Sequence, residues 1–246
     1  MIRKYIRDGV AISQVPNPNL DWITADNLAE ALQIAEQEGI SLRFVHWIRD
    51  PLKLIASSYF YTLHTKERWT QVPYLLDLKQ LVNKWCGILH TAQDRPVFCG
   101  DQTVEEILAR NESKSYHQIL HSLRPNIGFA LEAARLRVKL IGMAQIFDQT
   151  RRLENTITID LESAMEAFDQ TFRKIFQHLN FQNQGRCLQL AQRFDLSRPG
   201  SKGHPHAFNR SDVAASKLKQ DLMDAMESSS WFRINIEPFW LLLGYA

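Results

Sequence analysis

The sequence predicts an α/β domain with a short parallel sheet flanked by many helices, and three observations lead to this prediction. Residues 42–48 are rich in β-branched and aromatic side chains and too short for a helix, which is typical of a buried strand. Helical patterns lie on both sides of this strand, over residues 25–38 and 52–63. Residues 156–160, Thr-Ile-Thr-Ile-Asp, form a second strand pattern that leads directly into another helix. Such alternation builds parallel sheets, which bind ligands at the carboxyl ends of their strands.

Composition limits the classes of protein to which this chain can belong. The length suits one domain over residues 1–246, in which residues 1–23 are poorly patterned and expected to be irregular. A net charge of +2 is too small to indicate nucleic acid or an anionic membrane surface as the main partner. The apolar carboxyl end is far shorter than the roughly 20 residues of a membrane span. Three cysteines without metal-ligand spacing favour a reducing compartment, and a cytoplasmic protein without a metal site is therefore expected.

The junction after the first strand carries the main functional signal. Asp50 is suited to cap the following helix, and Pro51 suits the first helical position because its missing N–H would have no partner there. A helix that begins at the end of a strand offers free backbone amides to an anion, and Arg49 lies beside it. Ser57, eight residues after Arg49, is placed to share a phosphate with the guanidinium group. From these residues alone, a simple helix cap is an equally good interpretation.

With the aromatic pair Tyr59 and Phe60, this stretch resembles the 3′-phosphate-binding motif of the PAPS-dependent sulfotransferase family, and residues 115–132 resemble the bacterial members of that family. That motif is an Arg at a strand end, Asp/Asn-Pro, a Ser eight residues on and an aromatic pair. The resemblance implies a P-loop-NTPase-like sulfotransferase fold. It also implies 3′-phosphoadenosine 5′-phosphosulfate (PAPS), or its product adenosine 3′,5′-bisphosphate (PAP), as the ligand, with Arg49 and Ser57 holding the 3′-phosphate.

A late loop adds to the resemblance. Arg198, Gly200 and Gly203 match the spacing of the family's Arg-x-Gly-x-x-Gly loop, which also contacts the 3′-phosphate. Glycines let a backbone approach a phosphate closely, although a flexible polar loop would look the same. The loop departs from the family in the residues that follow, which here are His204, Pro205 and His206.

Two departures bear on activity. Leu161 stands where many family members place a tyrosine that contacts adenosine. No stretch before Thr24 matches the family's glycine-containing loop that cradles the 5′-phosphosulfate, so the resemblance covers residues 25–246. Because one oxyanion-stabilising donor alone can contribute about 2.7–4 kcal/mol, loss of the whole loop is expected to cripple transfer.

The catalytic residues cannot be assigned from the sequence. His46, His64 and His204 are the candidates for the acceptor side, although His46 inside a strand is also typical of a core residue. His117 and His121 lie one helical turn apart, and without a third ligand a solvated helix face is favoured over a metal site.

Two functions from different classes follow from this resemblance. The first is transfer of a sulfuryl group from PAPS to a hydroxyl or amine of a small-molecule acceptor. The alternative is a catalytically impaired or truncated sulfotransferase-fold protein that acts as a nucleotide-binding or protein-interaction module. A nucleoside-phosphate kinase is less favoured because it needs the missing phosphate loop as well. A homodimer would be common for such an enzyme, but the oligomeric state is not readable from the sequence.

Overall fold

The computed structural model describes residues 3–7, 10–14, 25–64, 68–71, 98–99, 102–111, 113–195 and 213–245. Contacts divide the chain into two units, residues 1–42 and 43–246, and each unit is described by itself. The assignment of the whole chain to a single domain stays a prediction.

The first unit contains a β-hairpin and a helix. Strands β1 (Arg3–Arg7) and β2 (Val10–Gln14) pair antiparallel. The expectation of an irregular stretch over residues 1–23 was therefore wrong for these ten residues, and the signal that it missed is the Asp-Gly pair between the strands, which two-residue hairpin turns favour. Helix α1 (Ala25–Gln37) agrees with the predicted helix. Gly39 follows it with a φ of 64°, a left-handed conformation that helix ends commonly place on glycine.

The second unit holds the predicted parallel sheet. Strands β3 (Phe44–Ile48) and β6 (Thr156–Asp160) pair in parallel, in a register that sets Ile48 opposite Asp160. Both strands were predicted from the sequence, although β3 begins two residues later than expected. The fold is thus a helix-rich α/β structure with a short parallel sheet of two described strands.

Helices make up most of the second unit. The long helix α7 begins at Pro125, and the helix predicted after β6 breaks at Ala167 into two. Residues 75–90, whose apolar spacing also predicts a helix, lie outside the described residues. No helix in the described part of the chain has an apolar run long enough to cross a lipid bilayer. The remaining elements are α2 (Pro51–His64), α3 (Arg68–Gln71), β4 (Phe98–Cys99), β5 (Gln102–Thr103), α5 (Val104–Ala109), α6 (Tyr116–Ser122), α7 (Pro125–Thr150), α8 (Leu161–Glu166), α9 (Phe168–His178), α10 (Gln184–Ala191), the 3₁₀ turn Gln192–Phe194, α11 (Val213–Glu227), α12 (Ser230–Asn235) and α13 (Glu237–Leu242).

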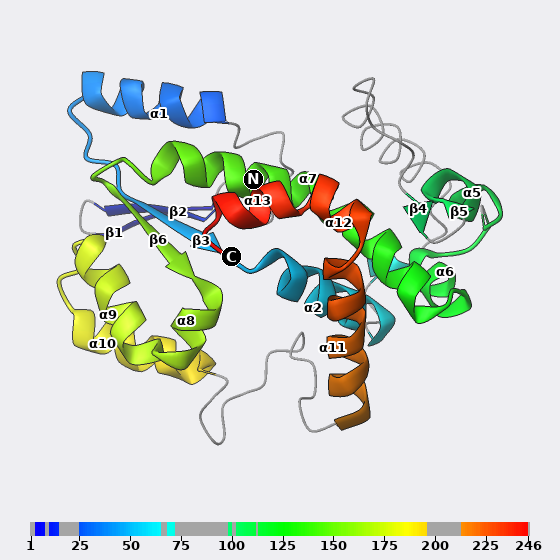
Figure 1. The fold of residues 1–246 in the computed structure, drawn as a ribbon. Coiled ribbons are helices and arrows are strands. Elements are labelled where there is room, and N and C mark those ends of the chain that lie inside the picture. The colour runs from blue at the N-terminus through cyan, green and yellow to red at the C-terminus, as the bar shows by residue number, and fades with distance from the viewer. Residues whose placement is uncertain are drawn as a thin grey trace. The chain divides into compact units, whose positions relative to one another are not determined.

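Both faces of the sheet are covered by helices, as Figure 1 shows. On one face Ile48 packs against Ala144 of α7 and against Leu243, which follows α13. On the other face Ile159 packs with Ala164 of α8 and Ile175 of α9. Period-two alternation along the strands produces this division, because neighbouring side chains point to opposite faces.

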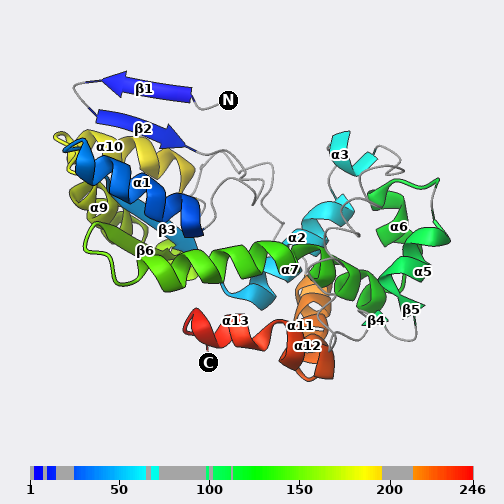
Figure 2. The ribbon, with the colours of Figure 1, turned by 90° about the horizontal axis from the view of Figure 1, so that it is seen from above.

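The largest apolar core lies around α2 and α7, with contributions from α6, α11 and α12. Figure 2 shows that α7 runs from the strand pair toward α5 and α6, so one helix links the sheet to this core. Gly128 permits the close packing of α2 on α7, because an added Cβ there would lie 3.1 Å from the Tyr59 ring. The position of α2, which carries the predicted motif, is therefore set by α7.

Candidate functional site

The first part of the candidate site is the N-terminus of α2. Oδ1 of Asp50 accepts hydrogen bonds from the amides of Leu52 (2.8 Å) and Lys53 (3.3 Å), as the cap prediction requires. The amide of Leu54 donates to the carbonyl oxygen of Asp50 at 2.8 Å. The prediction that free amides at this helix end bind an anion was therefore wrong, because Asp50 already occupies them.

Arg49 follows the end of β3 and pairs with a carboxylate from α8, the helix that follows the neighbouring strand β6. Its Nε lies 3.0 Å from Oε1 of Glu162, and the two side chains are 24% and 20% exposed. The parallel register produces this contact, since it brings the residues that follow Ile48 and Asp160 to the same edge. Nη1 and Nη2 of Arg49 donate no hydrogen bond to any residue that the structure describes. The guanidinium is thus held at one side, and its outer two nitrogens can receive a ligand.

Ser57 lies at the seventh position of α2, about 9 Å along the helix axis from Pro51 at a rise of 1.5 Å per residue. Its side chain is half-buried, and its hydroxyl makes no hydrogen bond within the described part of the chain. Ser57 thus keeps an available donor on the helix that Arg49 precedes. That the two residues hold one phosphate stays a prediction.

The end of β6 adds a second carboxylate and a phenol from the carboxyl end of the chain. Oδ2 of Asp160 caps α8 by accepting from the amide of Ser163 at 2.7 Å, and Oδ1 accepts a hydrogen bond from the Tyr245 hydroxyl. Burial by itself would raise the pKa of Asp160, but the bonds from Tyr245 and Ser163 outweigh it and hold the pKa below its usual value. Burial and the neighbouring Asp160 raise the pKa of Tyr245. We call the set of Arg49, Asp50, Asp160, Glu162 and Tyr245 the strand-end site.

Ser58, the residue after Ser57, belongs to a separate cluster around the buried carboxylate of Glu132. Ser58 donates to Oε1 of Glu132 at 2.5 Å, and the Tyr116 hydroxyl donates to Oε2 at 2.5 Å. Nε of Arg135 lies 2.8 Å from the same Oε2, Nη2 of Arg135 also contacts Oε1, and the guanidinium carbon lies 5.6 Å from the centre of the Tyr116 ring. This Glu132 cluster, made of Ser58, Tyr116, Glu132 and Arg135, ties together α2, α6 and α7.

The Glu132 carboxylate is fully buried, and both of its oxygens accept hydrogen bonds. Burial would raise its pKa, but the Arg135 charge and the hydrogen bonds from Arg135, Ser58 and Tyr116 outweigh it and place the pKa below the usual value. Burial and the same carboxylate raise the pKa of the Tyr116 hydroxyl. Glu132 is therefore ionised at neutral pH, with its neighbours as donors.

Of the three histidines predicted as acceptor-side candidates, the structure describes His46 and His64, which lie on β3 and at the far end of α2. His46 lies inside β3 with its ring 6.4 Å from that of Phe147, and burial lowers its pKa to about 4. Its Nδ1 is buried without a hydrogen-bond partner among the described residues. His64 ends α2, about 20 Å along the axis from the first residue of that helix, and its Nδ1 lies 2.6 Å from the carbonyl oxygen of Phe60.

The predicted late-loop residues lie outside the described residues, and their roles stay predictions. They are Arg198, Gly200, Gly203 and His204.

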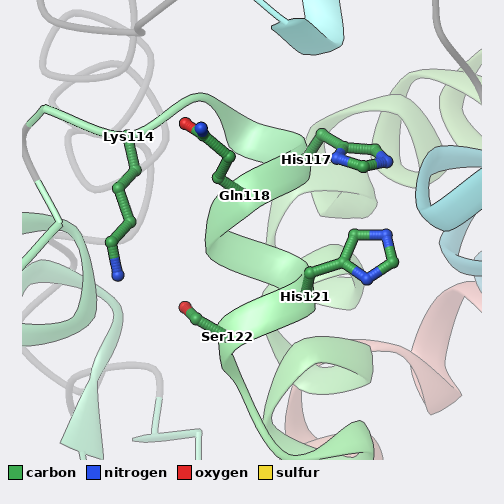
Figure 3. A pocket seen from close by; sticks show the side chains of 5 residues that line it. All are labelled: Lys114, His117, Gln118, His121 and Ser122. Atoms are coloured by element: carbon green, nitrogen blue, oxygen red, sulfur yellow. The ribbon is translucent and has the colours of Figure 1, made fainter.

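A surface pocket of about 470 Å³ lies on α6, away from the strand-end site. Figure 3 shows the rings of His117 and His121 on one side of the helix, whereas Gln118 and Ser122 point to the other. The two ring centres lie 4.3 Å apart, and Nε2 of His121 is 2.9 Å from the carbonyl oxygen of Leu63. Across the described ranges, no group of three His, Cys, Asp or Glu side chains is arranged to hold a metal ion. The fifth lining residue of the pocket is Lys114.

Sequence reasoning missed two of these features, and each has a readable signal. Glu132 lies on the apolar stripe of α7 that Phe129, Leu136 and Leu140 define, and a carboxylate within such a stripe indicates a buried polar cluster. Tyr245 follows Gly244 directly after a helix, a pattern typical of a glycine cap that fixes the direction of the next residue.

The strand-end site combines one arginine that has unused donors with three carboxylates and a phenol. Such a set can bind a ligand that presents a phosphate to the guanidinium and hydroxyl or amino groups to the carboxylates. The comparisons with known proteins found no family model, no curated protein and no solved structure that matches the chain.

Proposed function

We propose that this chain binds an adenosine nucleotide with a 3′-phosphate at the strand-end site, and that it is a sulfotransferase-type domain with a P-loop-like fold. The proposed donor is PAPS, the acceptor is a hydroxyl or amine of a small molecule, and the product nucleotide is PAP. Arg49 and Ser57 are the proposed ligands of the 3′-phosphate, with Arg198, Gly200 and Gly203 of the late loop as further contacts.

One observation carries the proposal, namely the way in which Arg49 is held. Glu162 accepts a hydrogen bond from Nε of Arg49, so the orientation of the guanidinium is fixed before a ligand binds. The two outer nitrogens form a planar fork that matches two oxygens of a phosphate. Because the ion pair is only about one quarter exposed, a phosphate there would be less screened than on an open surface.

The carboxylates of the site favour a ligand with hydroxyl and amino donors over a simple anion. Asp50, Asp160 and Glu162 together carry three negative charges against the single charge of Arg49 at neutral pH, which opposes binding of a bare phosphate or sulfate. Ribose hydroxyls and the adenine amino group can donate to carboxylates, as ribose does to an acidic residue at strand ends in dinucleotide-binding folds. Affinity is therefore expected to require the nucleoside as well as the phosphate.

The proposed reaction is an in-line transfer. An acceptor oxygen or nitrogen attacks the sulfur of PAPS, the bond from sulfur to the bridging phosphate oxygen breaks, and PAP leaves with the electron pair while the acceptor loses its proton. Positioning and fixed donors supply most of the catalysis in such transfers. His46 is neutral at pH 7 because its pKa is about 4, whereas His64 lies at the far end of α2. No general base is assigned.

A second candidate is nucleotide binding without transfer, in a protein that serves as a binding or interaction module. It is favoured by the cap on α2, because Asp50 occupies the amides of Leu52 and Lys53 that could otherwise serve a transferring group. The same strand-end site would bind the nucleotide under both candidates, and only turnover separates them.

The test is a calorimetric titration of the purified chain with PAP, adenosine 5′-monophosphate and inorganic sulfate. We expect PAP to bind at least tenfold more tightly than the monophosphate, since a charge-assisted hydrogen bond to the 3′-phosphate contributes about 1.5–3 kcal/mol. Arg49→Ala should abolish this preference. Arg151→Ala, which removes an exposed arginine paired with Asp148, is the matched control and should leave it intact.

Three outcomes are informative. Preferential PAP binding with turnover of PAPS supports the enzyme, and binding without turnover supports the module. Equal affinity for PAP and the monophosphate, or a preference that Arg49→Ala leaves unchanged, contradicts the proposed site.

A further inference from the structure

The carboxyl end of the second unit has a defined local geometry. The amide of Gly244 donates to the carbonyl oxygen of Leu241 at 3.0 Å, and the amide of Tyr245 donates to that of Trp240 at 3.1 Å. Gly244 has a φ of 86°. These two bonds and the left-handed glycine form the Schellman motif that ends α13. The chain therefore leaves the helix in one fixed direction, and Tyr245 is the first side chain after the turn.

This turn is anchored to the sheet. Leu243 is buried against Ile48 of β3 and Ala144 of α7, and the Tyr245 side chain packs at the border of the same group. A phenylalanine at position 245 would make the same apolar contacts. The Tyr245 hydroxyl, however, donates to Oδ1 of Asp160, so it adds a specific polar contact to this packing.

Asp160 connects Tyr245 to Arg49, the proposed ligand of the 3′-phosphate. Its second oxygen caps α8 through the amide of Ser163 at 2.7 Å. Helix α8 is only six residues long and carries Glu162 in its first turn. Glu162 in turn holds Nε of Arg49 at 3.0 Å. An unbroken series of contacts thus runs from Tyr245 to the guanidinium group.

We propose that Tyr245 is a positioning residue, which sets the orientation of the Arg49 guanidinium through Asp160 and Glu162. This inference rests on the proposed nucleotide function of Arg49. The carboxyl-terminal turn keeps the start of α8 in place, Glu162 then holds one side of the guanidinium, and the outer nitrogens point where the phosphate binds. Removal of the hydroxyl loosens this arrangement without removing any group that touches the ligand.

Two variants test the inference by different routes. Tyr245→Phe removes the hydroxyl and keeps the ring. Gly244→Ala keeps the hydroxyl and strains the turn that directs it, because the position has a positive φ, while no atom lies within 4 Å of the added Cβ. Gly39→Ala is the matched control, since Gly39 also follows a helix with a positive φ and equally open surroundings.

The measurement is the affinity for PAP in the wild type and in the Arg49→Ala background. We expect Tyr245→Phe and Gly244→Ala each to weaken PAP binding about three- to tenfold, which corresponds to the loss of one ordinary hydrogen bond. Gly39→Ala should bind PAP like the wild type. In the Arg49→Ala background, Tyr245→Phe should have a clearly smaller effect, because the route from Tyr245 to the phosphate through Glu162 and Arg49 is then lost.

Failure of the inference and failure of the proposed function give different results. If the wild type prefers PAP and Arg49→Ala abolishes that preference, but Tyr245→Phe and Gly244→Ala bind like the wild type, the inference alone is wrong. If Tyr245→Phe weakens binding equally in both backgrounds, Tyr245 acts independently of Arg49 and the positioning role is again wrong. If the wild type has no preference for PAP, the proposed function and this inference both fail.

Discussion

Two arginine–glutamate pairs border α2, and their surroundings differ in one decisive way. In the Glu132 cluster, Glu132 is completely buried and the Arg135 side chain is 15% exposed, with Ser58 and Tyr116 as further donors. At the strand-end site, Arg49 is 24% exposed, and its outer nitrogens donate to no described residue. The same two residue types therefore form a closed, satisfied cluster in one place and a pair with unused donors in the other.

This difference separates a role in stability from a role in binding. A buried carboxylate with all its donors in place contributes to the fold mainly because loss of one partner leaves an unpaired group in the interior. A partly exposed ion pair contributes little to stability, but its unused donors remain available to a ligand. The neighbouring serines follow the same division, because Ser58 belongs to the cluster, whereas Ser57 keeps an unused hydroxyl.

The largest expected effect separates the two glutamates. Glu132→Ala should lower the free energy of unfolding by about 3–5 kcal/mol, because it removes the buried carboxylate to which Arg135, Ser58 and Tyr116 donate. Glu162→Ala should lower it by about 1 kcal/mol or less. Urea unfolding at pH 7 measures both changes. Equal losses for the two variants would remove the distinction between a closed cluster and an open site.

The next effect concerns His46, a half-buried side chain of β3. Its pKa of about 4 in the folded state lies below the ordinary value of 6.5, so the unfolded chain takes up this proton first as the pH falls. Stability should therefore decrease from pH 6.5 toward pH 4, by up to about 1.4 kcal/mol per pH unit from this residue. His46→Leu should flatten that part of the curve of unfolding free energy against pH.

The control for this prediction is His121→Gln, which replaces an exposed histidine and leaves His46 in place. Its curve should keep the slope of the wild type. A slope that persists unchanged in His46→Leu would show that another group takes up the proton.

The smallest expected effects compare the two neighbouring serines. Ser58→Ala should destabilise the fold by about 1–3 kcal/mol, because the buried carboxylate of Glu132 loses a donor. Ser57→Ala should leave stability within about 0.5 kcal/mol of the wild type and weaken PAP binding about three- to tenfold. Thermal unfolding and calorimetry on the same two variants provide the measurements. A stability loss in Ser57→Ala together with weaker PAP binding in Ser58→Ala would contradict the roles assigned to the two serines.

Much of the local structure around the site could be predicted from the sequence, because short-range rules decide it. Strand β6 and the Asp50 cap follow from residue pattern and helix-start chemistry. The same cap explains why the predicted anion site at the start of α2 was wrong. Oδ1 of Asp50, which caps the helix, already accepts from the amides that an anion would need.

The contacts that complete the site join residues far apart in the chain, and no local pattern specifies such pairs. Arg49 and Glu162 meet only because β3 and β6 pair in parallel, and Tyr245 reaches Asp160 only because Leu243 packs on the sheet. The late-loop glycines Gly200 and Gly203 lie outside the described residues, so their contribution stays a prediction.

The most direct test of the account is a crystal structure of the chain with PAP bound. The account predicts the 3′-phosphate within about 3 Å of the outer nitrogens of Arg49, with Ser57 as a second donor and with Glu162 still on Nε. The Glu132 cluster should be unchanged, because Ser58, Tyr116 and Arg135 already donate to the buried Glu132 carboxylate. A 3′-phosphate bound elsewhere, with the outer nitrogens of Arg49 facing solvent, would contradict the account.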